Sequence, residues 1–329
     1  MEIIGLEEHF VVPGVLDAWQ ALDPRWQDLA TKASAEGEGR RRLLEFGPDR
    51  LAAMDDAGID IQVLSLTTPG VQDLAADLSV ELARASNDRV AEVVRSRPDR
   101  FQGFATLPTP APHAAAQELE RAVRKLGLQG AMVFGRTRDR NFDHRDFWPI
   151  FEAAAALKAP LYMHPQTPQN GVVDAYYTGF GEQVDSLFAR AGVGWHYETG
   201  IQIVRMVLSG VFAHFPDLQI ITGHWGEVVL FYLDRIDLLT DASKLPRKVS
   251  DYVRQHVYIT PSGLFSQRYL RWATEVVGVD RILMSTDYPF APAPNGAARK
   301  FLEQAELSQE DRFKIASGNW NRLCAGIRR

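Results

Sequence analysis

Four apolar runs, far apart in the sequence, each end in a side chain that can bind a metal ion. The runs begin at Ile3, Leu161, Ile220 and Ile282, and they end at His9, His164, His224 and Asp287. Short apolar runs bounded by polar residues are typical of strands buried in a parallel sheet. In a parallel barrel the carboxyl ends of the strands meet at one mouth, where such folds carry out their chemistry. The pattern therefore predicts that side chains from distant strands gather at a single metal-dependent site.

Strand-like runs alternate with helical segments along the chain, which predicts an α/β fold. We expect eight strands, near residues 2–8, 59–66, 101–107, 128–134, 160–164, 218–224, 257–260 and 281–287. Helices are expected in the charged stretch before residue 57 and near 78–96, 111–126, 146–157, 197–213, 226–240 and 266–277. The segment from Pro165 to about Gly194 is long for a loop and predicts an insertion after strand five. Together these features predict one (β/α)8 TIM barrel, a single catalytic domain spanning residues 1–329.

Composition excludes several classes of protein. The formal net charge of −6 indicates no basic surface, so we expect no nucleic-acid partner. No apolar run approaches the roughly 20 residues that span a bilayer, and the N-terminus lacks signal-peptide features, so no membrane partner is expected. Cys324 is the one cysteine, which excludes an intrachain disulfide and favours a reducing, cytoplasmic location. No obvious base lies beside Cys324 in the sequence, so a structural role is expected for its thiol.

Glu7 and His9 are two residues apart on the first predicted strand, so their side chains point to the same face. If that face lines the interior, both can reach one ion, and Glu8 points outward, toward the helices. The alternative is a charged strand end that is exposed to solvent.

His164 and Asp287 end two other predicted strands, and Pro165 stops the first of these directly after His164. His164 alone could be a hydrogen-bonded core residue, but the recurrence at several strand ends favours a metal site. The predicted ligands are Glu7, His9, His164 and Asp287. Two imidazoles and two carboxylates suit one divalent ion, Zn²⁺ or Mn²⁺, with Fe²⁺ or Co²⁺ as alternatives. Residues 127–135 contain no lysine, so no carbamylated lysine can bridge two ions there, and a mononuclear site is expected.

His224 has a candidate partner in Glu227, three residues later. A carboxylate that accepts a hydrogen bond from a histidine ring selects its tautomer and raises its basicity, which suits acid–base catalysis. The alternative is a glutamate that only complements a helix dipole. His196 follows Trp195 at the end of the long insertion, where it could contact a substrate or cap the next helix.

Seven motifs, in order along nearly the whole chain, resemble one known group of enzymes. They are LEEHF (6–10), ND (87–88), PDRF with GFATL (98–107), YMHP (162–165), GHWGE (223–227), YIT with SG (258–263) and STDYPF (285–290). The chain resembles the decarboxylase branch of the amidohydrolase superfamily. This branch includes the γ-resorcylate, 2,3-dihydroxybenzoate, salicylate and 5-carboxyvanillate decarboxylases and, more distantly, aminocarboxymuconate-semialdehyde decarboxylase. The most discriminating element is the Glu-x-His opening, because hydrolases of the superfamily generally open with His-x-His.

The resemblance implies roles for particular residues. Glu7, His9, His164 and Asp287 would bind the metal, and His224 and Glu227 would support catalysis. Phe290 would pack against the aromatic ring of the substrate. Trp195 and His196 are candidate substrate contacts from their place in the insertion, where the chain is most individual and the family's substrate is least transferable. Arg235 corresponds to an arginine that in relatives lies at a subunit interface near a neighbouring active site; the alternative is an ion pair with Asp234 or Glu227. A homo-oligomer, either a dimer or a tetramer, is also implied.

The implied reaction is the reversible, non-oxidative decarboxylation of an ortho-hydroxybenzoate-type aromatic acid, with release of CO₂. Asp287 would deliver a proton to the ring carbon that bears the carboxylate, while His224 and Glu227 maintain the protonation state of Asp287. One alternative is a metal-dependent hydrolase or lactonase on the same scaffold, with Asp287 as the base, although Glu7 speaks against it. The other alternative is a non-catalytic ligand-binding barrel, against which the intact ligand set argues.

Overall fold

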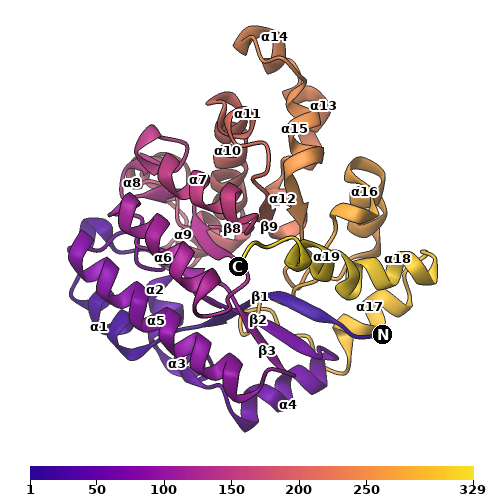
Figure 1. Ribbon diagram of the computed structural model, residues 1–329. Coiled ribbons are helices and arrows are strands. Elements are labelled where there is room, and N and C mark those ends of the chain that lie inside the picture. Colours follow the sequence, from indigo (N-terminus) through magenta and orange to yellow (C-terminus); the bar gives the residue numbers. More distant parts are fainter.

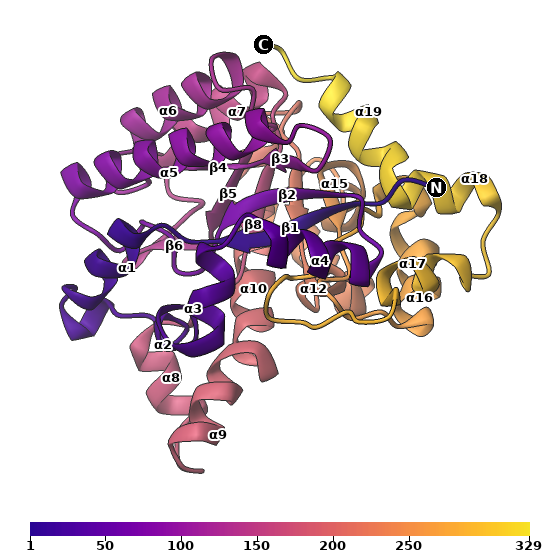
Figure 2. The ribbon, with the colours of Figure 1, turned by 90° about the horizontal axis from the view of Figure 1, so that it is seen from below.

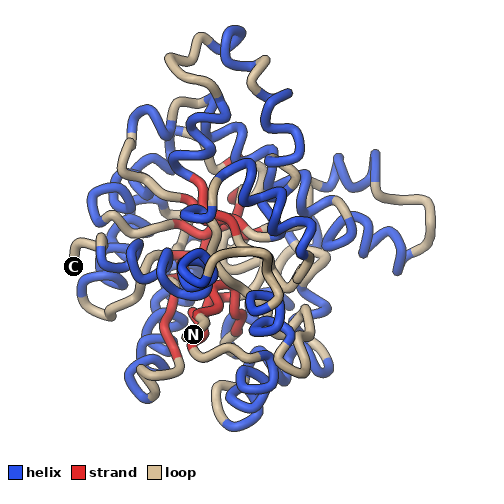
Figure 3. Tube along the Cα trace, turned by 90° about the vertical axis from the view of Figure 1, so that its right-hand side faces the viewer, coloured by secondary structure: helices blue, strands red, loops and turns tan.

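The computed structural model describes residues 1–329, with parallel strands at the centre and helices around them (Figures 1 and 3). The parallel strands are β1 (Ile4–Phe10), β2 (Ile61–Leu66), β3 (Phe101–Gly103), β4 (Ala105–Thr106), β5 (Ala131–Phe134), β8 (Leu161–His164), β9 (Ile220–Thr222) and β10 (Val257–Ile259). A small antiparallel pair, β6 (Arg136–Thr137) and β7 (Arg140–Asn141), follows β5. The α/β alternation expected from the sequence is therefore present.

Hydrogen-bonded neighbours connect the strands into two sheets, β1-β2-β3 and β10-β9-β8-β5-β4. Phe104 separates β3 from β4, and its amide donates to the carbonyl of Leu64 in β2. The segment 282–288 lies between β1 and β10, because Met284 and Tyr288 bridge to β1 and Ile282 bridges to Ile259. Neighbour by neighbour, the parallel arrangement thus leads from β1 through all the other parallel strands to the segment 282–288, which lies beside β1 again.

The continuous eighth strand predicted for residues 281–287 is wrong, since only isolated bridges form there. The reason is a side-chain contact with β1. The Thr286 amide donates to the carboxylate of Glu8 at 2.8 Å instead of to a neighbouring backbone, and Asp287 adopts a positive φ of 61°.

Helices cover the strands on their outer side (Figures 1 and 2). Their bounds are α1 (Pro13–Gln20), α2 (Thr31–Ala35), α3 (Gly37–Leu44), α4 (Pro48–Ala57), α5 (Ala76–Ser96), α6 (Pro112–Arg124), α7 (Trp148–Leu157), α8 (Asn170–Tyr176), α9 (Glu182–Leu187), α10 (Gly194–Leu208), α11 (Val211–His214), α12 (His224–Glu227), α13 (Leu233–Ile236), α14 (Leu239–Ser243), α15 (Val249–His256), α16 (Gln267–Val277), α17 (Ala297–Glu303), α18 (Gln309–Phe313) and α19 (Asn319–Ala325). The helices predicted near 78–96, 111–126, 146–157 and 266–277 correspond closely to α5, α6, α7 and α16. None of the helices is long and apolar enough to cross a membrane.

Two predicted helices need correction. The segment 197–213 forms α10 and α11, separated at Gly210, whose φ is 82°. The continuous helix predicted for residues 226–240 is wrong, because the chain there makes a left-handed turn followed by the short helices α13 and α14. The predicted insertion after His164 contains α8, α9 and a π-helical turn over Phe188–Gly192; α8 and α9 project from the body of the molecule (Figure 2).

Neighbouring residues of the strands contribute to two different apolar clusters. Ile3 and Ile220 belong to a cluster of 65 buried residues that includes the helices, whereas Ile4 and Ile221 belong to a cluster of ten. This alternation follows from the period of two in a strand. The small cluster draws on nearly every strand and is completed by Trp320 of α19. Cys324 packs against both clusters, and burial raises the pKa of its thiol to about 12, which fits the structural role expected for it.

Candidate metal centre

An irregularity in β1 sets the direction of Glu7. The pairing of β1 with β2 shifts between Gly5 and Glu8, so that Leu6 and Glu7 together oppose a single residue of β2. Such a bulge inserts one extra residue into the strand and interrupts the alternation, so that two consecutive side chains can point to the same face of the sheet. Leu6 consequently packs in the ten-residue cluster, and Glu7 reaches the hydroxyl of Tyr162, which belongs to the same cluster. His9 follows Glu7 on this face, as their spacing predicts.

The two carboxylate oxygens of Glu7 have different surroundings. Oε2 accepts hydrogen bonds from Tyr162 at 2.7 Å, from the Ser262 hydroxyl, and from Ser285 at 3.4 Å. Oε1 lies 3.2 Å from His164 Nε2 and has no hydrogen-bond donor. Burial acts to raise the pKa of Glu7, but the surrounding histidines outweigh it and hold that pKa well below its usual range. An ionised carboxylate is therefore anchored by one oxygen and presents the other.

His164 is oriented by partners on its Nδ1 side. The carbonyl of Pro165 accepts from Nδ1 at 2.8 Å, and the hydroxyl of Thr68 lies 2.7 Å from the same nitrogen. A hydrogen bond to one ring nitrogen decides which nitrogen carries the proton. The lone pair of Nε2 is therefore directed at Glu7.

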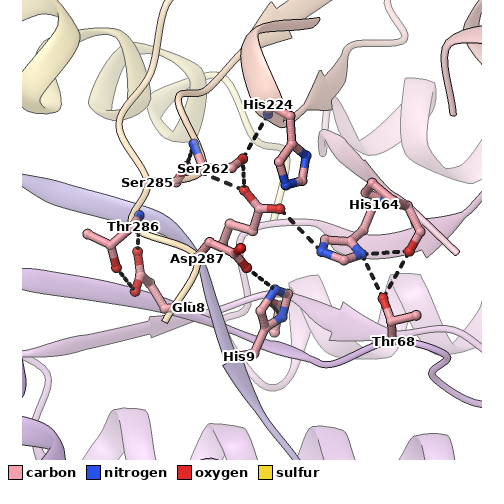
Figure 4. Close-up of polar contacts among 12 residues, drawn as sticks. Glu8, His9, Thr68, His164, His224, Ser262, Ser285, Thr286 and Asp287 are labelled. Carbon is pink, nitrogen blue, oxygen red and sulfur yellow. Dashed lines mark hydrogen bonds and ion pairs between the residues drawn. The ribbon is translucent and has the colours of Figure 1, made fainter. Parts of the chain in front are cut away.

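His9 and Asp287 complete the cluster. His9 Nε2 lies 3.3 Å from Asp287 Oδ1, and Ser65 Oγ lies 3.3 Å from His9 Nδ1. Burial lowers the pKa of His9, which favours the neutral ring that binds metals, and burial raises the pKa of Asp287. The side chains of His9, His164 and Asp287 point toward one another (Figure 4).

The arrangement fits a divalent cation. One ligand atom each from Glu7, His9, His164 and Asp287 lies within 4.8 Å of the others. Glu7 Oε1 and His9 Nε2 are buried without a hydrogen-bond partner, and buried polar atoms are seldom left in this state. Two imidazole nitrogens and two carboxylate oxygens are a donor set that Zn²⁺ and Mn²⁺ accept. The structure thus brings together the four ligands predicted from the sequence.

Glu8 points to the opposite face from Glu7, as predicted, and is fully buried there. It accepts hydrogen bonds from the amide and hydroxyl of Thr286, at 2.8 and 2.6 Å, and from Gln62 at 3.0 Å. Burial raises its pKa to about 8. The buried Arg50 donates to the carbonyl of His9 and lies 4.5 Å from the centre of the Tyr288 ring. These contacts hold the backbone beside His9 and Asp287.

His224 and His196 share one buried carboxylate. His224 Nδ1 lies 2.7 Å from Oε1 of Glu227, and His196 Nδ1 lies 2.8 Å from Oε2. Burial alone would lower the pKa of His224, but Glu227, Glu7 and Asp287 raise it to about 10. Burial acts to raise the pKa of Glu227, but the neighbouring His224 and His196 outweigh it, and the pKa is lowered. The pairing of His224 with Glu227 was predicted; the contact of His196 with Glu227 was missed, because 31 residues separate them.

The turn that carries His224 and Glu227 is left-handed. Five consecutive residues, from His224 to Val228, have φ between 46° and 87°. The prediction that strand six continues to His224 is wrong, since β9 ends at Thr222. The turn is held by the Trp225 amide, which donates to Thr260 at 2.9 Å, and by the His224 amide, which donates to Ser262 Oγ at 2.9 Å. Left-handed backbone in residues other than glycine is costly and concentrates at functional sites.

A cavity of about 280 Å³ opens beside the cluster. Its wall includes His164, Asp287 and His224. The predicted substrate contacts Trp195, His196 and Phe290 also line it. This volume lies near the lower end of the range for small-molecule sites. A larger hollow of about 890 Å³ beside Trp26 is more open and contains none of the predicted site residues.

Arg235 is not among the residues of this chain that line the cavity. It lies exposed on α13 and forms no ion pair with Asp234 or Glu227, and Glu227 is occupied by two histidines. The ion-pair alternative for Arg235 is therefore wrong, and its interface role stays a prediction.

The hydroxyl side chains around the candidate ligands and around Glu8 were not predicted as site residues. They are Ser65, Thr68, Tyr162, Ser262, Ser285 and Thr286. Tyr162, Ser262, Ser285 and Thr286 lie in the motifs that carry the family resemblance, which was a signal that could have identified them.

Comparison with known proteins agrees with this geometry. The family model for amidohydrolases matches residues 9–323. The γ-resorcylate decarboxylase of Polaromonas sp. (strain JS666) is 36% identical over 337 residues, covering 97% of each chain, and that of Rhizobium sp. (strain MTP-10005) is 34% identical with the same coverage. The crystal structure of 5-carboxyvanillate decarboxylase from Sphingomonas paucimobilis is 33% identical with a TM-score of 0.89, covering 99% of each chain. The structure of the dihydroxybenzoic acid decarboxylase from Polaromonas sp. JS666, with bound manganese and 2-nitroresorcinol, is 34% identical with a TM-score of 0.84, covering 98% of this chain and 97% of that one. The chain therefore belongs to the amidohydrolase family, in its decarboxylase branch.

Proposed function

We propose that this protein is a metal-dependent, non-oxidative decarboxylase of an ortho-hydroxybenzoate-type aromatic acid. The observation that carries the proposal is the buried cluster of Glu7, His9, His164 and Asp287 at the edge of a cavity that fits one aromatic ring. The names of the similar proteins support the reaction class. The circuit of parallel neighbours supports a single closed (β/α)8 barrel over residues 1–329, with an insertion after the fifth strand.

Glu7, His9, His164 and Asp287 would hold one divalent ion, and the manganese in a similar structure supports Mn²⁺ beside Zn²⁺. A bound divalent ion supplies positive charge that orients the substrate's oxygens and withdraws electron density from them. The site would act in a homo-oligomer, and its partner is a small aromatic carboxylic acid.

Asp287 is proposed as the proton donor. Burial raises the pKa of Asp287, and its carboxyl group lies at the edge of the cavity, next to a bound ring. Transfer of a proton from Asp287 to the ring carbon bearing the carboxylate interrupts the aromatic system. The bond to the carboxylate then breaks, its electron pair restores the aromatic ring, and CO₂ leaves. Asp287 regains a proton from solvent before the next turnover.

His224 and Glu227 act through Asp287. With a pKa raised to about 10, His224 is cationic at neutral pH and provides a positive charge near Glu7 and Asp287. Glu227 holds the ring of His224 in one orientation. Phe290, whose ring centre lies 5.8 Å from that of His9, and Trp195, 6.2 Å from that of His164, present aromatic faces that exclude water and pack against the substrate.

The test is CO₂ release from a panel of hydroxylated benzoates by protein reloaded with Mn²⁺ or Zn²⁺. We expect metal-dependent release from at least one member. Absence of release from all of them, together with turnover of esters or lactones, would replace the proposal with a hydrolase.

Asp287→Asn tests the assigned proton donor. The variant is expected to retain some bound metal and to lose turnover by at least about 100-fold, since general acid–base groups contribute 10²–10⁴-fold. Metal content by elemental analysis and CO₂ release would be measured on the same preparation. Full activity in this variant would exclude proton delivery by Asp287.

A further inference from the structure

Arg190 lines the same cavity as the metal-binding cluster. It belongs to the π-helical turn Phe188–Gly192 within the insertion, and the chain departs from helical geometry at Arg190 itself (φ −105°, ψ −125°). Interruptions of this type are frequent at functional sites. Because the insertion is far from the strand ends in sequence, Arg190 brings a cation to the cavity from a separate element.

The guanidinium of Arg190 has no acidic partner. Its Nε donates to the carbonyl and hydroxyl of Ser186, at 3.1 and 3.2 Å, and its Nη2 donates to the same hydroxyl at 2.9 Å. Nη1 has no hydrogen-bond partner, and no carboxylate lies within ion-pair distance. The charge of the more distant Asp28 acts to raise the pKa of Arg190, but the carboxylate of Asp28 accepts hydrogen bonds from the amide and hydroxyl of Thr167. The edge formed by Nη1 and Nη2 is therefore free for a planar anion.

The other ionisable groups in the cavity wall are already engaged. His164 and Asp287 belong to the metal-binding cluster, and His196 and His224 are paired with Glu227. Arg190 is half-buried, and this burial lowers the pKa of its guanidinium. Arginine in such a position binds carboxylates through two parallel hydrogen bonds.

Small side chains leave room near this edge. Ala30, Ala33, Ser34 and Ala191 all line the cavity together with Arg190. A ring that carries only a hydroxyl and the reacting carboxylate would leave the guanidinium without an anion in a partly desolvated place. A further substituent on the ring would fill this space.

We propose that Arg190 recognises a second carboxylate on the substrate, so that the preferred substrates are ortho-hydroxylated aromatic dicarboxylic acids. This inference rests on the proposed function. One carboxylate is lost as CO₂ at the metal-binding cluster, while the other is held by Arg190 and leaves with the product.

The experiment compares kcat/KM for salicylate with kcat/KM for three of its carboxylated derivatives, 2-hydroxyisophthalate, 4-hydroxyisophthalate and 2-hydroxyterephthalate. The wild-type protein is expected to prefer at least one derivative over salicylate by roughly 10- to 100-fold, the range of a hydrogen-bonded charge pair. Arg190→Gln should remove this preference, mainly through a higher KM, and leave salicylate within about twofold. Arg190→Lys, which keeps the charge but loses the two-point geometry, should retain part of the preference.

Arg205→Gln is the matched control, because Arg205 binds Asp143 on the surface of α10 and does not line the cavity. It should leave the preference unchanged. No preference in the wild-type protein, or an equal loss for salicylate and its derivatives in Arg190→Gln, would overturn the inference.

Binding of non-reacting acids separates this inference from the proposed function. Benzoate, isophthalate and terephthalate lack the ortho-hydroxyl, and their affinities for the metal-loaded protein can be measured by calorimetry. Tighter binding of a dicarboxylate that disappears in Arg190→Gln supports the inference even if no hydroxybenzoate releases CO₂. Equal affinity for all three acids would contradict it, whatever the outcome of the turnover assay.

Discussion

At the scale of single residues, Glu7, His9 and His164 each have one polar atom held by the protein and another left for the ion. Glu7 is held through Oε2 and His164 through Nδ1, so that Oε1 and Nε2 face the shared centre. The hydrogen bonds to the held atoms fix the tautomer of His164 and the orientation of both side chains before any ion binds. It is the reason that hydroxyl groups of no obvious chemical importance surround the cluster.

Thr68→Val tests this support. Valine has nearly the shape of threonine but lacks the hydroxyl that lies 2.7 Å from His164 Nδ1. We expect metal affinity to fall by about 10-fold, at the low end for such outer contacts, because the Pro165 carbonyl still binds the ring. Competition with a chelator would measure it. Thr137→Val, which removes a hydroxyl bonded to Thr109 outside the cavity, is the control. Equal affinities in the two variants would contradict the supporting role.

Asp73 provides a prediction about pH and stability. Burial, with Asp28 nearby, raises its pKa to about 6. The folded protein therefore binds this proton more tightly than the unfolded chain, whose aspartate pKa is about 4, and stability falls as pH rises from about 4 to about 6. Asp73→Asn removes the ionisation. The Tm of the variant minus that of the wild type should increase over this range and level off above it. Scanning calorimetry from pH 4 to 8 would test this, with Asp241→Asn on the exposed α14 as the control.

At the scale of elements, the turn from His224 to Val228 shows how local backbone cost is offset by tertiary contacts. Every residue of the turn is left-handed. The Trp225 amide donates to the Thr260 carbonyl and the Trp225 indole donates to the Leu264 carbonyl, and these two bonds hold the turn against the loop after β10. Within this left-handed turn, His224 Nδ1 lies 2.7 Å from Oε1 of Glu227.

Gly226→Ala is expected to destabilise this turn. Gly226 has a φ of 87°, and an added Cβ would lie 2.8 Å from Leu230 Cγ. Holding an alanine in the left-handed conformation costs about 1–2 kcal/mol of stability, and the close approach of its Cβ to Leu230 adds to this cost. Chemical denaturation should show a lower free energy of unfolding, with weaker catalysis as well. Gly171→Ala on α8 is the control, because a Cβ there meets nothing within 4 Å. If both variants unfold alike, the turn is not under the strain inferred here.

At the scale of the whole molecule, the ten-residue cluster connects strands from both ends of the chain. Trp320, from the last helix, packs against Phe104 with ring centres 5.5 Å apart, and its indole donates to Gln102 at 2.8 Å. A residue near the C-terminus thus completes the packing of strands that begin at residue 4. Formation of the site therefore depends on the complete fold.

Trp320→Ala is expected to lower the free energy of unfolding by about 3–5 kcal/mol, the usual cost of truncating a buried tryptophan. Denaturant titration followed by circular dichroism would measure the change. Trp26→Ala, at a partly exposed position, should cost clearly less. A similar loss in the two variants would show that Trp320 is not part of an essential core.

The sequence by itself determined the alternation of strands and helices, the four candidate ligands in or after buried apolar runs, and the pairing of His224 with Glu227. These features follow from hydrophobic period and from spacing of a few residues, which are local properties. Only the tertiary structure decided the bulge that aims Glu7, the isolated bridges at 282–288, the left-handed turn, the second histidine on Glu227 and the place of Arg190. These depend on hydrogen bonds between distant residues, such as Tyr162 with Glu7 across 155 positions and Ser262 with Glu7 across 255. Local pattern contains no information about which hydroxyl meets which carboxylate, because that is determined by packing of the whole chain.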